Sequence, residues 1–128
     1  MPQVLASLES AGIRWGIVTN KIARFTVPLV AAIGLAPRAS AVVSGDTTAY
    51  AKPHPAPLLH AAELSGVAPE LCVYVGDDLR DIQAGKAAGM RTVTAAYGYC
   101  GEGDPPETWG ADFLVRHPAE LIPLLLPA

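Results

Sequence analysis

Short apolar runs alternate with helical patterns along almost the whole chain. Strands are expected at residues 13–18, 40–44, 71–75, 91–96 and 112–115. Helices are expected at residues 2–11, 21–33, 55–65 and 118–125, and from the turn after residue 76 to Gly89. Strands that alternate with helices are joined by right-handed crossovers into a parallel sheet with both faces covered. The sequence therefore predicts an α/β fold, a Rossmann-like parallel sheet with helices on both faces.

The expected helix at residues 21–33 has two features that bear on its packing. It carries four large apolar side chains at helical spacing: Ile22, Phe25, Leu29 and Ile33. It also contains Pro28, which lacks the N–H of an internal helical hydrogen bond and predicts a kink or a break. Gly34 follows as the expected end of the helix.

The composition indicates one domain that spans residues 1–128. Nine basic and twelve acidic residues give a net charge of −3, which argues against nucleic acid or a membrane surface as a partner. Gly, Pro and charged residues interrupt every apolar stretch well before the length of a membrane span, and no signal-peptide pattern opens the chain. Two cysteines, Cys72 in an expected strand and Cys100 in an expected loop, form no disulfide framework. We therefore expect free thiols and a cytoplasmic location.

Three carboxylates, Asp77, Asp78 and Asp81, lie within five residues, directly after the apolar run at residues 73–76. Carboxylates at the turn between a strand and a helix suit Mg²⁺, which takes one or two of them and otherwise binds water and phosphate oxygens. A capping box, with Asp78 as N-cap and Asp81 at N3, explains two of these acids without a metal. It leaves Asp77 as an additional charge at the end of a buried strand. This stretch alone leaves both interpretations open.

Polar side chains also follow two other expected strands. Thr19 and Asn20 come after the strand at residues 13–18, and Lys52 ends the polar loop after the strand at residues 40–44. Thr19 or Asn20 could simply cap the next helix, and Lys52 could be a solvated lysine. Alternatively, the hydroxyl and nearby backbone N–H groups hold phosphate oxygens, and the ammonium offsets phosphoryl charge. Ligands of parallel α/β sheets bind outside the carboxyl ends of the strands. We therefore expect these residues to form one phosphate site together with the acid turn, which is the segment from Asp77 to Asp81.

Three motifs in the chain resemble the second, third and fourth motifs of the haloacid dehalogenase superfamily. They are Ile17-Val18-Thr19-Asn20, Lys52-Pro53-His54-Pro55 and Val75-Gly76-Asp77-Asp78-Leu79-Arg80-Asp81. Further stretches are similar to the phosphoglycolate phosphatase group, which includes relatives acting on small sugar phosphates such as N-acetylmuramic acid 6-phosphate. They are residues 84–89, 91–93 and 97–99. The resemblance extends from Val4 to the expected C-terminal helix.

The resemblance implies a role for each matched side chain. Thr19 would hydrogen-bond the phosphoryl group with help from Asn20, and Lys52 would stabilise the charge of the phosphoryl group and the nucleophile. Asp77 would bind Mg²⁺, and Asp81 would support the site through Lys52 or a metal-bound water. The implied activity is Mg²⁺-dependent hydrolysis of a small phosphorylated metabolite through an aspartyl-phosphate intermediate.

The first motif of the family, Asp-x-Asp-Gly-Thr, is absent from the sequence. In the family it supplies the nucleophilic aspartate on a central strand, which would lie between the expected strands at residues 13–18 and 71–75. Those two strands would have to pair across the gap or leave their facing edges unpaired. The cap domain that reads the substrate is missing too. We therefore expect this chain to be a segment of a longer protein. By itself the segment should be inactive, and it should self-associate through its unpaired sheet edges.

Two alternative functions remain open. A non-catalytic remnant, serving as a binding or oligomerisation module, is consistent with the missing motif, whereas the three intact motifs argue against it. A phospho-accepting receiver domain also combines acids, a threonine and a lysine on a parallel sheet. Receiver domains have their acidic pair early and their lysine late, whereas here Thr19 and Lys52 precede the acids.

Overall fold

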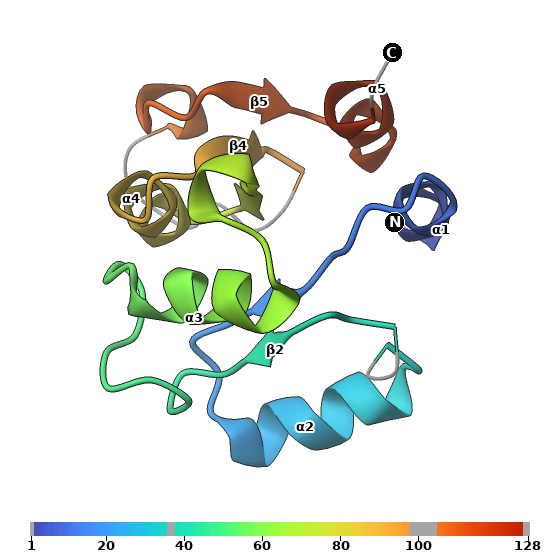
Figure 1. Cartoon of the computed structure of the whole chain (residues 1–128). Coiled ribbons are helices and arrows are strands. Elements are labelled where there is room, and N and C mark those ends of the chain that lie inside the picture. The colour runs from blue at the N-terminus through green and yellow to red at the C-terminus, as the bar shows by residue number, and fades with distance from the viewer. Residues whose placement is uncertain (1, 36–37, 98–104, 127–128) are drawn as a thin grey trace.

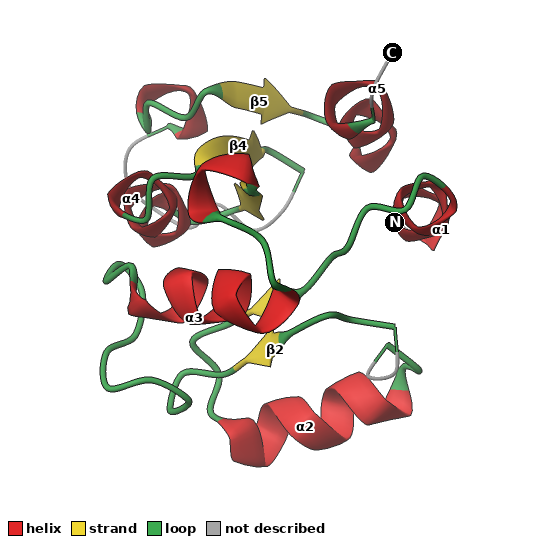
Figure 2. Ribbon diagram, viewed as in Figure 1, coloured by secondary structure: helices red, strands yellow, loops and turns green. Residues whose placement is uncertain are grey.

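The computed structural model describes residues 2–35, 38–97 and 105–126 (Figure 1). In chain order the elements are α1 (Pro2–Ser10), β1 (Ile17–Val18), α2 (Ala23–Ala32), β2 (Val42–Val43), α3 (Ala56–Ser65), β3 (Val73–Gly76), α4 (Leu79–Ala87), β4 (Arg91–Ala95), β5 (Phe113–Val115) and α5 (Leu121–Leu125). Short 3₁₀ turns occupy Pro69–Leu71, Pro106–Thr108 and Pro118–Glu120. The predicted alternation of strands and helices is confirmed (Figure 2).

The strands form two parallel sheets rather than one. β1 pairs with β2, and the other sheet has the order β3-β4-β5. β1 and β3 share no ladder, so of the two outcomes expected for their facing edges the unpaired one is observed. Main-chain pairing requires a neighbouring strand within about 5 Å, and no described segment provides one between β1 and β3.

Two apolar clusters involve helices that lie on different sides of β4 in Figure 1, with α1 and α5 on one side and α3 and α4 on the other. One cluster joins α1 and α5 to β4 and β5 through Val4, Leu8, Val93, Val115 and Leu121. The other joins α3 and α4 and extends to side chains of β1 and β3 through Leu58, Ala62, Ala84, Ala88 and Met90. The α/β class with helices on both faces is thereby confirmed.

Helix α2 departs from its prediction at its first residue and at Pro28. It begins at Ala23 rather than at residue 21, and it runs through Pro28 without a break. Pro28 is exposed and removes a single internal hydrogen bond, which one helix can tolerate. The four regularly spaced apolar side chains are exposed, and the helix contacts the body through Thr26 and Val30 instead.

Several segments are shorter than expected or lie outside the described residues. β1 and β2 contain two residues each, and Cys72 ends a 3₁₀ turn just before β3 rather than lying in it. Cys100 and residues 98–99 of the expected loop fall outside the described part of the chain. Among the described helices, none is both long and apolar enough to cross a membrane.

Asp112 holds the start of β5 against β4. Its carboxylate Oδ2 accepts hydrogen bonds from Thr92 N at 2.8 Å and from Thr92 Oγ1 at 3.2 Å. The bond from the Thr92 backbone N–H lowers the pKa of the Asp112 carboxyl below its usual value. A lowered pKa in the folded state means that the stabilisation is complete above the usual value and is lost as the pH falls through the lowered one.

The substitution Asp112→Asn is therefore expected to reduce the loss of stability that acid causes. Urea unfolding at about pH 7 and about pH 3 measures this loss as the difference between two midpoints. Glu63→Gln is the matched control, because Glu63 is exposed and its side chain makes no hydrogen bond within the described residues. An equal acid-induced loss in wild type and Asp112→Asn would contradict the prediction.

Candidate functional site

The residues singled out from the sequence line one pocket at the carboxyl ends of β1 and β3. Its lining consists of Thr19, Asn20, Lys21, Lys52, Asp77, Asp78, Arg80 and Asp81. Thr19 follows β1 directly, Asp77 follows β3, and Lys52 arrives from the loop after β2. All five candidate side chains are thus brought together, as expected where parallel strands end at one edge of the structure.

Three hydrogen bonds hold the side chain of Lys52 in the pocket. Its Nζ donates to Asp81 Oδ1 at 2.6 Å, to Tyr74 Oη at 2.8 Å and to Val18 O at 3.2 Å. These three bonds use all three hydrogens of the ammonium. The Lys52 and Asp81 side chains are only 9% and 8% exposed, so this ion pair is buried. Lys52 is therefore oriented by β1, β3 and α4 at once.

Asn20 fixes the backbone on which Lys52 is carried. Its Oδ1 accepts from Lys52 N at 3.0 Å, and its Nδ2 donates to Lys52 O at 3.1 Å. The sequence predicted that Asn20 helps to bind phosphate, but both polar atoms of its amide bond the backbone of a neighbouring loop. Gly45 makes this approach feasible, because a Cβ there would lie 2.7 Å from the carbonyl carbon of Asn20 and closer still to its oxygen.

The acid turn contains the predicted capping box. Asp78 Oδ1 accepts from Arg80 N at 2.9 Å, and Asp81 Oδ2 accepts from Asp78 N at 3.1 Å. Asp81 Oδ2 also accepts from Asp77 N at 3.1 Å, so one carboxylate binds two backbone N–H groups and Lys52. Gly76 leaves room for it, because a Cβ there would come within 2.5 Å of Asp81 Oδ2. The capping interpretation holds for Asp78 and Asp81.

Asp77 is the carboxylate that capping does not use. It is half-buried in the pocket lining, and its side chain makes no hydrogen bond or ion pair with any described residue. No cluster of three or more His, Cys, Asp or Glu side chains suited to a metal occurs in the described part of the chain. Asp77 thus offers one free carboxylate to a cation, and the described residues do not complete a metal site.

Thr19 does not cap α2, although capping was one interpretation of its position. Its Oγ1 accepts from Lys21 N at 3.1 Å, which closes a turn and leaves its own O–H free to donate. The first N–H of α2, from Ala23, binds Asp46 Oδ1 at 2.8 Å, so the helix start is held by a residue from the loop after β2. Neither Thr19 nor Asn20 is needed for the helix.

Three members of the site were missed by the sequence analysis: Tyr74, Arg80 and Lys21, the last of which is an exposed lysine in the lining. Tyr74 Oη accepts from Lys52 and lies within hydrogen-bond distance of Val18 O at 3.2 Å. Burial, and then the nearby Asp81 carboxylate, raise the pKa of Tyr74 well above its usual value, so the phenol stays protonated. Arg80 lines the pocket and pairs with Asp78, which lowers the pKa of that carboxyl. A tyrosine in an otherwise apolar strand was the available signal for Tyr74.

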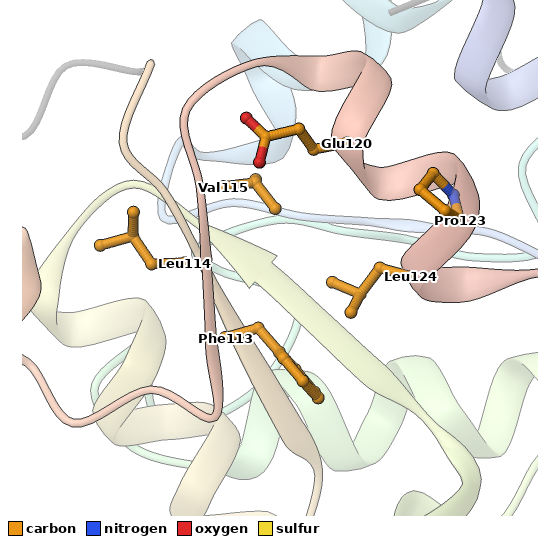
Figure 3. A pocket seen from close by; sticks show the side chains of 6 residues that line it. All are labelled: Phe113, Leu114, Val115, Glu120, Pro123 and Leu124. Atoms are coloured by element: carbon orange, nitrogen blue, oxygen red, sulfur yellow. The ribbon is translucent and has the colours of Figure 1, made fainter.

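A second pocket lies between β5 and α5 (Figure 3). Its lining is mostly apolar and comprises Phe113, Leu114, Val115, Glu120, Pro123 and Leu124. The one carboxylate, Glu120, accepts hydrogen bonds from Arg116 N and His117 N, both at 3.0 Å. The lining shares no residue with the pocket around Lys52, and it provides no free charged group for catalysis.

Comparisons with known proteins identify relatives over nearly the whole chain. The chain is 45% identical over 125 residues to the N-acetylmuramic acid 6-phosphate phosphatase of Pseudomonas aeruginosa, a match to 98% of this chain and 55% of that protein. It is 53% identical over 118 residues to the phosphoglycolate phosphatase of Xylella fastidiosa, which covers 90% of this chain and 50% of that protein. The chain therefore spans about half the length of these curated relatives.

Solved structures and a family match agree with these relatives. The crystal structure of a predicted phosphoglycolate phosphatase from Haemophilus somnus superposes with a TM-score of 0.88 at 28% identity, over 97% of this chain and 55% of that one. The sequence model of the haloacid dehalogenase-like hydrolases matches residues 1–89. The resemblance to phosphoglycolate phosphatases is thus confirmed. Because the family match covers more than half of the chain, the protein belongs to the haloacid dehalogenase-like hydrolase family.

Proposed function

We propose that this chain is the carboxyl-terminal part of the catalytic core of a Mg²⁺-dependent phosphomonoester hydrolase. The observation that carries the proposal is the convergence of Thr19, Lys52 and Asp77 on one pocket at the strand ends. The named phosphatase activities of the relatives in Pseudomonas and Xylella support this reaction class. The substrate proposed is a small phosphorylated sugar or organic acid, and the location proposed is the cytoplasm.

Each side chain of the pocket would contribute a separate interaction. Thr19 has a free O–H to donate to a phosphoryl oxygen. Lys52 has all three hydrogens engaged, so it acts on a bound phosphate as a fixed positive charge, or by giving up the bond to neutral Tyr74. The pair with Asp81 holds the ammonium within the pocket lining before any phosphate arrives, which is the preorganisation that electrostatic catalysis requires.

A magnesium ion fits the donor set in part. Mg²⁺ binds through one or two carboxylates and completes its shell with water and phosphate oxygens, and Asp77 supplies one unused carboxylate. Bound there, Mg²⁺ would offset the negative charge of phosphate oxygens. The remaining protein ligand and the nucleophilic aspartate would come from the Asp-x-Asp-Gly-Thr motif, which this sequence does not contain. We therefore propose that the 128-residue chain by itself is inactive.

Titration of the chain with Mg²⁺ in the presence of inorganic phosphate tests the proposal. We expect Mg²⁺ to shift the backbone amide resonances of residues 76–81, and Asp77→Asn to weaken this response by about tenfold or more. The control is Asp46→Asn, since Asp46 lies outside the pocket lining and binds Ala23 N. An unchanged response in Asp77→Asn would contradict the metal assignment. Phosphomonoester turnover by the chain alone, lost in Asp77→Asn, would contradict the need for an added nucleophile.

The alternative function is a non-catalytic binding or oligomerisation module. The unpaired facing edges of β1 and β3 favour it, because they leave backbone groups available to another strand. In that case Mg²⁺ and phosphate would leave the amide resonances of residues 76–81 unchanged. The same titration therefore distinguishes the two functions.

A further inference from the structure

The outer side of α2 carries an apolar stripe that no described residue covers. The α2 stripe consists of Ile22, Phe25, Leu29 and Ile33, which are 42%, 55%, 48% and 57% exposed. At about 100° per residue Phe25, Leu29 and Ile33 fall within an arc of about 80°, and Ile22 is the N-cap residue that precedes the helix. Figure 1 shows α2 at the lower edge of the molecule, next to β2 and away from the other helices.

A helix whose apolar face points to solvent calls for an explanation. An amphipathic pattern of this kind normally packs against a core. In α2, however, the buried side chains are those of the neighbouring Thr26 and Val30. A row of four large apolar side chains is more than the single exposed residues that need no account.

We propose that the α2 stripe joins two copies of this chain across a twofold axis, with the two α2 helices antiparallel. The order of side chains along the stripe is nearly symmetric about its centre, with isoleucine at both ends and Phe25 and Leu29 on either side of the middle. An antiparallel pair therefore places Ile22 opposite the partner's Ile33, and Phe25 opposite the partner's Leu29. A self-complementary row of this kind is what an isologous interface needs.

The charges around α2 favour the antiparallel arrangement over a parallel one. Lys21 and Arg24 lie at the amino end of the helix, and the Asp46 carboxylate, which accepts from Ala23 N, offsets one of these two positive charges. Arg38, beyond the other end of the helix, is paired with Glu9. A parallel pair would bring the basic ends together. An antiparallel pair places each basic end near the carboxyl end of the other helix, where the helix dipole is negative.

The size of the stripe sets the expected strength of the dimer. From Ile22 to Ile33 the helix rises about 16 Å. A contact of this length buries less than the roughly 800 Å² per partner of standard stable interfaces. The dimer should therefore be weak and reversible, and it should form with increasing protein concentration.

Sedimentation velocity across about a hundredfold range of protein concentration tests the proposal. The wild-type mass is expected to rise from monomer toward dimer, and Leu29→Glu is expected to stay monomeric throughout. Val27→Glu is the matched control, because Val27 is 59% exposed on the same helix and lies about 160° away from Leu29 around its axis. It should dimerise like wild type. Circular dichroism checks that both variants are folded.

Disulfide trapping provides a second measurement that does not depend on a disruptive charge. In a background with Cys72→Ser and Cys100→Ser, chains with Phe25→Cys are mixed with chains carrying Leu29→Cys and oxidised. The mixed disulfide is expected to form several-fold faster than either like pair. A wild type that is monomeric at every concentration would overturn the proposal and assign the stripe to a different polypeptide. Dimers that persist in Leu29→Glu would overturn it in favour of pairing through the sheet edges.

Discussion

Replacing Lys52 by methionine is expected to lower the free energy of unfolding by about 3–5 kcal/mol. The substitution keeps the apolar stem but removes the ammonium, which leaves the 8%-exposed Asp81 carboxylate without its cation. It also removes the donors to Val18 O and Tyr74 Oη. Urea unfolding of the purified chain measures the loss.

Two further variants separate the buried charge from the general effect of losing a lysine. Lys21→Met is the control, because Lys21 lines the same pocket but is exposed and unpaired within the described residues. It should change stability by less than about 0.5 kcal/mol. The double variant Lys52→Met/Asp81→Asn should be more stable than Lys52→Met alone, since it no longer buries an unpaired charge. Equal losses of stability in Lys52→Met and in Lys21→Met would mean that the ion pair does not stabilise the site.

Gly45→Ala is expected to disrupt the approach of two loops and to cost about 3 kcal/mol. The added Cβ would overlap the carbonyl oxygen of Asn20, which is a backbone atom and cannot rotate away. The loops would have to separate, breaking the bond from Gly45 N to Lys21 O at 2.8 Å and straining the bonds between Asn20 and Lys52. The expected result is lower stability together with weaker phosphate binding at the pocket.

The control for this substitution is Gly12→Ala. Gly12 has a positive φ of 75°, and a Cβ there would have no neighbour within 4 Å. It should therefore show only the backbone cost of a left-handed residue, about 1–2 kcal/mol, with phosphate binding unchanged. A Gly45→Ala protein no less stable than Gly12→Ala would show that the loops are free to move apart.

The candidate residues could be found from the sequence because their signals are local. Thr19 and Asp77 each follow an apolar run at a strand end, Lys52 ends the polar loop after the next strand, and Asp78 and Asp81 have the spacing of a capping box. Their convergence follows from a general rule for parallel sheets. The hydrogen bonds within the site could not be predicted from such a rule, because Asn20 bonds a lysine that lies 32 residues further along the chain. Tyr74 was missed for the same reason, because its partner Lys52 is 22 residues away.

The sequence by itself determined the α/β class, the order of the elements and the chemistry of the strand ends. Those properties depend on periodicity and capping within one or two turns of chain. Only the tertiary structure decided that the strands divide into two sheets, that Lys52 uses every hydrogen of its ammonium, and that the apolar face of α2 meets solvent. Each of these three properties depends on which segments, distant in the sequence, pack against each other in space. A helix has the same apolar pattern whether its partner is the body of its own chain or a second molecule.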